Sequence, residues 1–157
     1  MTEKLVANLS FAVEKLRILI LEDDPSRMAM FKDMLKQHEV VECATAAEAI
    51  SALGNRPCFH VAFLDHDLGG EAMVASGPGT GYEVACWIEE HLERSPSVIV
   101  IHSFNPSGSR EMAAALRHCA VDCLPGAWMM DFHSLLCRLF KIAVENGAVI
   151  GDAREFA

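Results

Sequence analysis

The stretch VAFLDHDLGG, residues 61–70, joins an apolar run to a polar tip. Four apolar residues are followed directly by Asp65, His66 and Asp67, and two glycines close the segment. A short apolar run that ends in polar and glycine residues is typical of a strand buried on both faces. The two acids and the histidine would then lie together at the carboxyl end of that strand, which makes them a candidate site.

Four other segments have the same short, apolar and β-branched character, and helical patterns lie between them. The five predicted strands are residues 17–22, 39–43, 60–65, 97–102 and 120–124. Strands that alternate with helices over short connections predict an α/β fold with a doubly wound parallel sheet. The common flavodoxin-like order for five such strands is 2-1-3-4-5.

Several predicted helices begin at recognisable caps. Asp24 precedes a proline and is expected to be the N-cap of the first helix, and residues 45–48 and 80–83 each have the pattern of a capping box. Residues 69–80 are expected to form a mobile flap over the site that ends at the Thr80 cap. The third of these helices is expected to have one apolar face, made of Val84, Ala85, Ile88 and Leu92.

Two further helices are expected later in the chain and one before the first strand. Residues 111–118 are alanine-rich, and residues 132–143 have an apolar stripe at helical spacing. Residues 1–16 are predicted to form an additional amphipathic helix. The expected organisation is therefore an N-terminal extension over 1–16, one domain over 17–146 and a C-terminal tail over 147–157.

Composition restricts the possible functions. The chain has 157 residues, about one domain, and half of them are hydrophobic. A net charge of −9 argues against binding to duplex DNA, which requires many basic side chains at the phosphates. No stretch is long and apolar enough to span a membrane, and the first residues lack the apolar core of a secretory signal. Six scattered cysteines without a CxxC pair are expected to be reduced, which favours a cytoplasmic location.

The predicted sheet brings three polar clusters together, because strands 1, 3 and 4 are neighbours in the order 2-1-3-4-5. The first strand ends in Glu22 and Asp23, the third in Asp65, and the fourth is followed by Ser103. Carboxylates are the ligands that Mg²⁺ prefers, together with water and phosphate oxygens. We therefore expect Mg²⁺ or Mn²⁺ at Asp23 and Asp65, with Glu22 as a further ligand.

The histidines have two interpretations. His66 and His102 follow neighbouring strands, so both can face one cleft and transfer protons near neutral pH. Alternatively, both form hydrogen bonds that hold the loops. Asp67 can bind the metal, orient His66 or turn the loop. Ser103 and Asn105 can donate to phosphate oxygens, although Asn105 before a proline is also an ordinary turn signal.

These segments resemble the receiver domain of two-component signalling over roughly residues 17–146. ILILEDDPSRMAMFKDML resembles the first strand and helix of that family, and VAFLD resembles the strand that ends in its phosphoacceptor. The resemblance places the metal-binding acid pair at Glu22 and Asp23 and the phosphoacceptor at Asp65. It also matches Gly81 to a glycine that follows the loop after the third strand.

Three positions depart from the receiver pattern. His102 stands where the family has Ser or Thr, Leu124 stands where it has Lys, and Gly69 stands where a proline is usual, within a longer loop. The combination LDHDLG, TGYEV and VIVIHSFNPSG is more similar to a divergent branch, the cyclic-phosphate-processing receivers. That resemblance implies activity on cyclic phosphates.

Three functions follow as alternatives. The first is a metal-dependent phosphoesterase that opens a cyclic phosphate on a nucleotide or an RNA end, with His66, His102 and Asp65 in catalysis. The second is a signalling receiver, in which a histidine kinase phosphorylates Asp65. The third is a non-catalytic interaction module that keeps an acidic cleft. The missing lysine at Leu124 weighs against the second, and the sequence indicates no oligomeric state.

Overall fold

The computed structural model describes residues 15–123. The predicted helices at 1–16 and 132–143 and the tail at 147–157 lie outside this range, except for residues 15 and 16, so the predicted domain limits stay predictions. The strands are β1 (Arg17–Leu21), β2 (Glu39–Cys43), β3 (Val61–Leu64), β4 (Val98–Ile101) and β5 (Val121–Cys123). The helices are α2 (Pro25–Met34), α3 (Ala46–Asn55), α4 (Gly81–Glu90), the short 3₁₀ helix η1 (Leu92–Arg94) and α5 (Pro106–Ala115).

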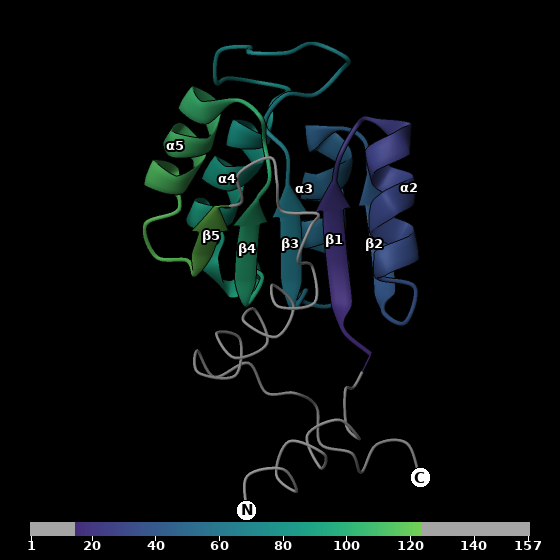
Figure 1. Ribbon diagram of the computed structural model, residues 1–157. Coiled ribbons are helices and arrows are strands. Elements are labelled where there is room, and N and C mark those ends of the chain that lie inside the picture. The colour runs from purple at the N-terminus through teal and green to yellow at the C-terminus, as the bar shows by residue number, and fades with distance from the viewer. Residues whose placement is uncertain (1–14, 124–157) are drawn as a thin grey trace, which may run out of the picture.

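The five strands form one parallel sheet in the order β2-β1-β3-β4-β5, which confirms the predicted fold class. Figure 1 shows the strands side by side with their carboxyl ends at one edge, where the long connection after β3 also lies. The order places β1 and β3 at the centre of the sheet. Ligands of such sheets bind outside the carboxyl ends of the strands, near the point where the strand order reverses.

Alternating side chains of the central strands enter two apolar layers. Leu19 and Leu64 belong to the layer beneath α3, α4 and α5, whereas Ile20 and Phe63 pack beneath α2. All four side chains are buried. Burial on both faces explains why these strands have continuous apolar runs instead of alternating patterns.

The caps of α2 and α3 form as predicted. Asp24 accepts from the backbone N–H of Arg27 at 2.8 Å, and Thr45 and Glu48 form a complete capping box. The predicted box at Thr80 is wrong. The Thr80 hydroxyl instead donates to the carbonyl of Gly77 at 2.7 Å, because the preceding loop turns back on itself there.

Two other helix predictions need correction. α4 ends at Glu90, and Leu92 lies in η1 with its side chain exposed instead of continuing the apolar face. α5 begins at Pro106 rather than at residue 111 and ends at Ala115. Asn105 is its N-cap and accepts from the backbone N–H of Gly108 at 2.9 Å, so this residue starts a helix instead of an isolated turn.

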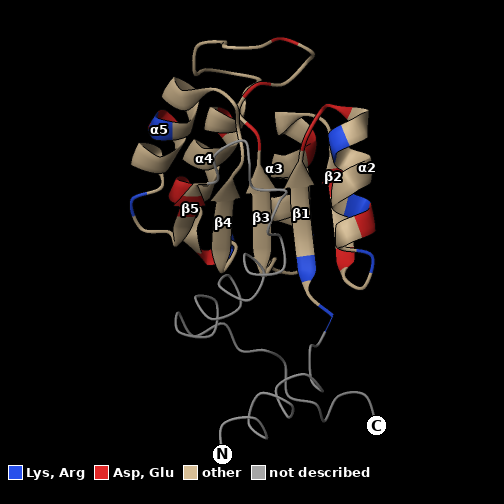
Figure 2. Cartoon of the chain, viewed as in Figure 1, with Lys and Arg blue, Asp and Glu red and all other residues tan. Residues whose placement is uncertain are grey.

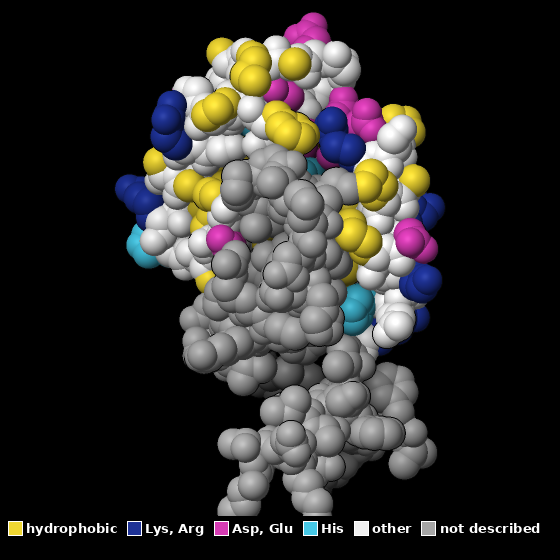
Figure 3. All heavy atoms as spheres, viewed as in Figure 1, with side chains coloured by type: hydrophobic (Ala, Val, Ile, Leu, Met, Phe, Trp, Pro, Cys, Tyr) yellow, Lys and Arg dark blue, Asp and Glu magenta, His cyan; other side chains and the backbone are white. Residues whose placement is uncertain are grey.

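Among residues 15–123, no helix combines the length and the apolar character that a membrane span requires. Acidic segments follow the carboxyl ends of β1 and β3, as Figure 2 shows. Figure 3 shows acidic and basic side chains next to each other at the same end of the molecule.

Candidate metal and phosphate site

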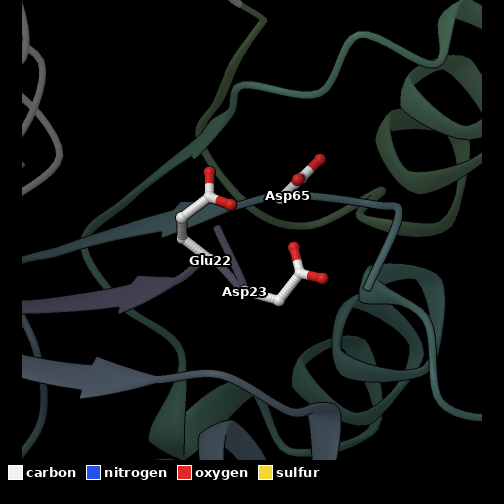
Figure 4. A group of neighbouring side chains, drawn as sticks. All are labelled: Glu22, Asp23 and Asp65. Atoms are coloured by element: carbon white, nitrogen blue, oxygen red, sulfur yellow. The ribbon is translucent and has the colours of Figure 1, made fainter. Parts of the chain in front are cut away.

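Three carboxylates meet at the carboxyl ends of β1 and β3. Glu22 and Asp23 follow β1, and Asp65 follows β3. Oxygen atoms from the three groups all lie within 4.8 Å of one another, and Figure 4 shows the three side chains gathered around one small region. Glu22 and Asp65 are buried, and Asp23 is partly exposed. The structure therefore brings the predicted metal ligands together.

The pairing of β1 with β3 explains this convergence. Leu21 lies opposite Leu64, so the next residue of each strand, Glu22 and Asp65, stands at the same level of the sheet. The ladder continues past the strand ends, since the N–H of Asp65 donates to the carbonyl of Leu21 at 3.0 Å. The two acids are thus held by backbone hydrogen bonds rather than by flexible loops.

Arg27, in the first turns of α2, contacts all three acids. Its Nη2 lies 2.7 Å from Glu22 Oε1, 3.3 Å from Asp65 Oδ2 and 4.0 Å from Asp23 Oδ1, and its Nε donates to Glu22 Oε2 at 2.8 Å. Sequence reasoning missed this residue. The available signal was its position four residues after Asp23, on the helix that the Asp24 cap begins.

Burial and neighbouring charges set the electrostatics of the cluster. Burial raises the pKa of Asp65 to about 6, and the nearby charge of Glu22 acts in the same direction. A hydrogen bond from Ser103 and the charge of Arg27 oppose this rise. The hydrogen bonds to Glu22 raise the pKa of Arg27 further above its ordinary value. Positive charge is therefore favoured at this point of the structure.

A cavity of about 330 Å³ opens beside the acids. This volume lies at the lower end of the range of small-molecule sites. Its lining combines the acidic residues with groups from the long loop and from the segment after β4. The lining residues are Asp23, Asp24, Pro25, Arg27, Asp65, Asp67, Gly70, Glu71, Ala72, Ser103 and Phe104.

His66 is buried and connects the long loop after β3 to α5. Its Nδ1 lies 2.7 Å from Asp67 Oδ1, and its Nε2 lies 2.9 Å from the hydroxyl of Ser76. A carboxylate only accepts, so Nδ1–H donates to Asp67, and in the neutral ring Nε2 accepts from Ser76. Asn105 Nδ2 donates to Asp67 Oδ1 at 2.9 Å and to the carbonyl of Val74 at 2.9 Å.

These contacts hold Asp67 ionised at the cavity. Burial acts to raise its pKa, but hydrogen bonds from Asn105, His66 and the Met73 amide leave the pKa below its ordinary value. Asp23 also holds the loop, since its Oδ2 accepts from the N–H of Gly70 at 2.6 Å. The loop over 69–80 is thus fastened to the site at several points.

His102 is buried beneath Glu22 rather than at the surface of a cleft. Its Nδ1 lies 3.8 Å from Glu22 Oε2, and its ring contacts that of Phe31 with centroids 5.0 Å apart. Burial, together with the charge of Arg27, lowers the pKa of His102 to about 3. The expectation of two histidines that face one open cleft is therefore wrong in its geometry. Asp67 lines the cavity, whereas His66 and His102 are not among its described lining residues.

Two glycines allow the close packing around this site. A Cβ on Gly81 would lie 2.0 Å from the carbonyl oxygen of Asp65, and a Cβ on Gly108 would lie 2.4 Å from the ring of His66. Gly81 is the glycine that the receiver resemblance singled out. The need for Gly108 was not visible in the sequence, because it depends on how α5 lies against His66.

The donor set fits a hard divalent cation. Three carboxylates supply only oxygen ligands, and one or two of them with water and phosphate oxygens are enough for Mg²⁺. Their negative charge is already balanced in part by Arg27, as the distances above show. The residues that would hold the ion are Asp23 and Asp65, with Glu22 nearby. Ser103 borders the same cavity, and its hydroxyl donates to Asp65.

Several solved structures with a similar fold are receiver domains. The receiver domain of a sensor histidine kinase from Pseudomonas aeruginosa, solved with magnesium in its active-site cleft, is 19% identical with a TM-score of 0.63, and the match covers 82% of this chain and 99% of that one. A CheY-like receiver from Methanospirillum hungatei is 21% identical with a TM-score of 0.60, over 84% and 99%. The Francisella response regulator 1452 receiver is 13% identical with a TM-score of 0.62, over 83% and 98%.

These identities establish the shared fold alone. A search among curated proteins found no significant match. The family model described as the cyclic-phosphate processing receiver domain matches residues 17–118, which contain the three acids, Arg27, both site histidines and the long loop. The chain therefore belongs to the cyclic-phosphate processing receiver family, as the sequence resemblance implied.

Proposed function

We propose that this receiver domain binds a divalent cation at Asp23 and Asp65, with Glu22, and opens a cyclic phosphate on a nucleotide or an RNA end. The observation that carries the proposal is the convergence of three carboxylates within 4.8 Å beside a cavity of about 330 Å³. The family description supports the class of substrate. Mg²⁺ or Mn²⁺ would supply positive charge that offsets and polarises the phosphate.

Opening a cyclic phosphodiester consumes one water. A bond forms between phosphorus and the water oxygen, the bond between phosphorus and one ribose oxygen breaks, and one proton passes from the water to that ribose oxygen. Asp67, which borders the cavity and is hydrogen-bonded to His66 Nδ1, is placed to take part in this proton transfer. Asp65 lines the same cavity, and Ser103 and Asn105 form hydrogen bonds with neighbouring groups.

We assign different roles to the two histidines. His66 does not line the cavity and orients Asp67 through Nδ1, so we predict that His66→Ala lowers the rate by about 10²-fold, the effect of misplacing a reacting group. His102 is buried with a pKa of about 3, so we expect His102→Ala to disturb Glu22 and to leave the pH dependence near neutrality unchanged.

Hydrolysis of nucleoside 2′,3′-cyclic phosphates across a pH series, with Mg²⁺ or Mn²⁺ and with chelator, tests both assignments. A wild type without metal-dependent turnover on any cyclic phosphate would remove the enzymatic proposal. Full activity in His66→Ala would remove His66 from the mechanism. A shift of the neutral limb of the pH profile in His102→Ala would contradict the structural role assigned to His102.

A second candidate is a phosphoacceptor receiver. Asp65 stands at the end of β3 beside the cavity, and it accepts a hydrogen bond from Ser103. A histidine kinase would then be the partner. We predict poor phosphorylation, because Leu124 stands where receivers have the lysine that pairs with the phosphoryl group. Leu124 itself lies outside the described residues.

Incubation with acetyl phosphate and Mg²⁺, followed by intact-mass measurement, tests the second candidate. We expect little or no mass increase of one phosphoryl group in the wild type. A stable, stoichiometric adduct that disappears in Asp65→Asn would favour signalling over hydrolysis. The Asp33→Asn variant, which changes an exposed acid of α2, is the matched control.

A further inference from the structure

Arg27 already pairs with Glu22 and Asp65, two of the three acids around the proposed cation site. Its guanidinium forms two parallel contacts with Glu22, through Nη2 to Oε1 at 2.7 Å and through Nε to Oε2 at 2.8 Å. The same Nη2 lies 3.3 Å from Asp65 Oδ2. Two-point pairing of arginine with a carboxylate is among the stronger ionic contacts in proteins, and Glu22 is buried.

A guanidinium and a metal ion cannot share these oxygens fully. The ligand atoms of the three acids lie within 4.8 Å of one another, so a cation bound there would come close to the positive charge of Arg27. The metal ion and the guanidinium are both positive, and water screens their repulsion poorly beside the buried carboxylates. Binding of a cation therefore requires Arg27 to move away from at least one of the acids.

The side chain of Arg27 borders the cavity and can turn towards it. Its side chain is 32% exposed and it is the one basic side chain among the described residues that line the cavity. The exposed ring of Phe104, 6.0 Å from the guanidinium carbon, lies beside it. An oxyanion in the cavity would thus meet Arg27 directly, and arginine suits phosphate because its planar fork can donate to two oxygens.

We propose that Arg27 competes with the divalent cation for Glu22 and Asp65, and that it pairs with the phosphate of the ligand once the cation holds those acids. This inference rests on the proposed function and gives Arg27 a role in positioning the phosphate, in addition to its ion pair with Glu22. Arg27 weakens metal binding in the absence of phosphate and makes metal and phosphate bind cooperatively. By linkage, each ligand raises the affinity for the other by the same factor.

Calorimetric titration of the whole chain with Mg²⁺, alone and with saturating inorganic phosphate, tests the exchange without measuring catalysis. Arg27→Gln removes the competing charge, and Arg27→Lys keeps the charge but cannot form both contacts with Glu22. Lys32→Gln is the matched control, because it removes one positive charge from the same helix at an exposed ion pair with Glu42. Circular dichroism establishes that each variant is folded.

We expect Arg27→Gln to bind Mg²⁺ alone about tenfold more tightly than the wild type, Arg27→Lys to be intermediate and Lys32→Gln to match the wild type. We also expect phosphate to raise the Mg²⁺ affinity of the wild type by about 5–150-fold, the usual range of such coupling, and that of Arg27→Gln by less. Equal or weaker Mg²⁺ binding in both Arg27 variants would overturn the exchange while leaving the metal site intact. If Arg27→Gln does not fold, Arg27→Lys alone decides the question in the same way. Absence of Mg²⁺ binding in every protein would overturn both the exchange and the proposed function.

Discussion

Asp65 is a buried carboxyl beside other charged groups. Burial and the neighbouring Glu22 raise its pKa to about 6, against an ordinary value of 3.8. A carboxyl with a raised folded-state pKa stabilises the fold while it is protonated. That contribution is fully present below about pH 4 and is lost as the pH rises through about 6. Even beside Arg27, the ionised carboxylate therefore opposes folding at neutral pH unless a bound metal ion compensates it.

We predict that Asp65→Asn raises the free energy of unfolding by about 1–3 kcal/mol near neutral pH, since two pKa units correspond to at most about 3 kcal/mol. The gain should be small near pH 4, where the wild-type carboxyl is protonated. Urea unfolding in chelator at the two pH values measures it, with Asp33→Asn as an exposed control. A gain of the same size at both pH values would contradict the assigned pKa shift.

At the level of secondary-structure elements, α5 packs on the imidazole of His66 and fixes its position. α5 begins directly after the Asn105 cap, and its first turn passes over the imidazole so closely that only glycine fits at position 108. The same cap residue donates to Asp67 and to Val74 of the long loop. The start of α5, the histidine and the loop therefore form one connected unit.

We predict that Gly108→Ala destabilises the protein by about 1–3 kcal/mol, the usual effect of overpacking, because its Cβ would overlap the ring of His66. Displacement of that ring should also release Ser76 and increase cleavage of the 69–80 loop by protease. Gly54→Ala in α3 is the control, since its nearest neighbour would be 3.8 Å away and alanine favours helix. Equal stability and equal cleavage of the two variants would show that the ring is not fixed by α5.

At the scale of the whole molecule, the sheet and the convergence of the acids could be predicted from sequence. Apolar runs marked the five strands, and the order of a five-stranded doubly wound sheet made the ends of β1 and β3 neighbours. Glu22, Asp23 and Asp65 then had to meet, because each is tied to a strand end.

The rest of the site depends on packing that no local pattern encodes. The direction of Arg27 follows from how α2 lies on the sheet, and the burial of His66 follows from the return of the loop and the approach of α5. His102 is covered because Phe31 of α2 packs on its ring. The position of a residue at a strand end was therefore easier to predict than the helices and loops that cover its side chain.

The most direct test of the metal and phosphate site is a crystal structure with Mn²⁺ and a non-hydrolysable analogue of a nucleoside 2′,3′-cyclic phosphate, with the metal located by its anomalous signal. We predict one anomalous peak within about 2.5 Å of carboxylate oxygens from Asp23 and Asp65, with the phosphorus in the adjoining cavity. An anomalous map without a peak at these acids, or an analogue bound elsewhere while Arg27 keeps its contacts with Glu22 and Asp65, would contradict the proposed site.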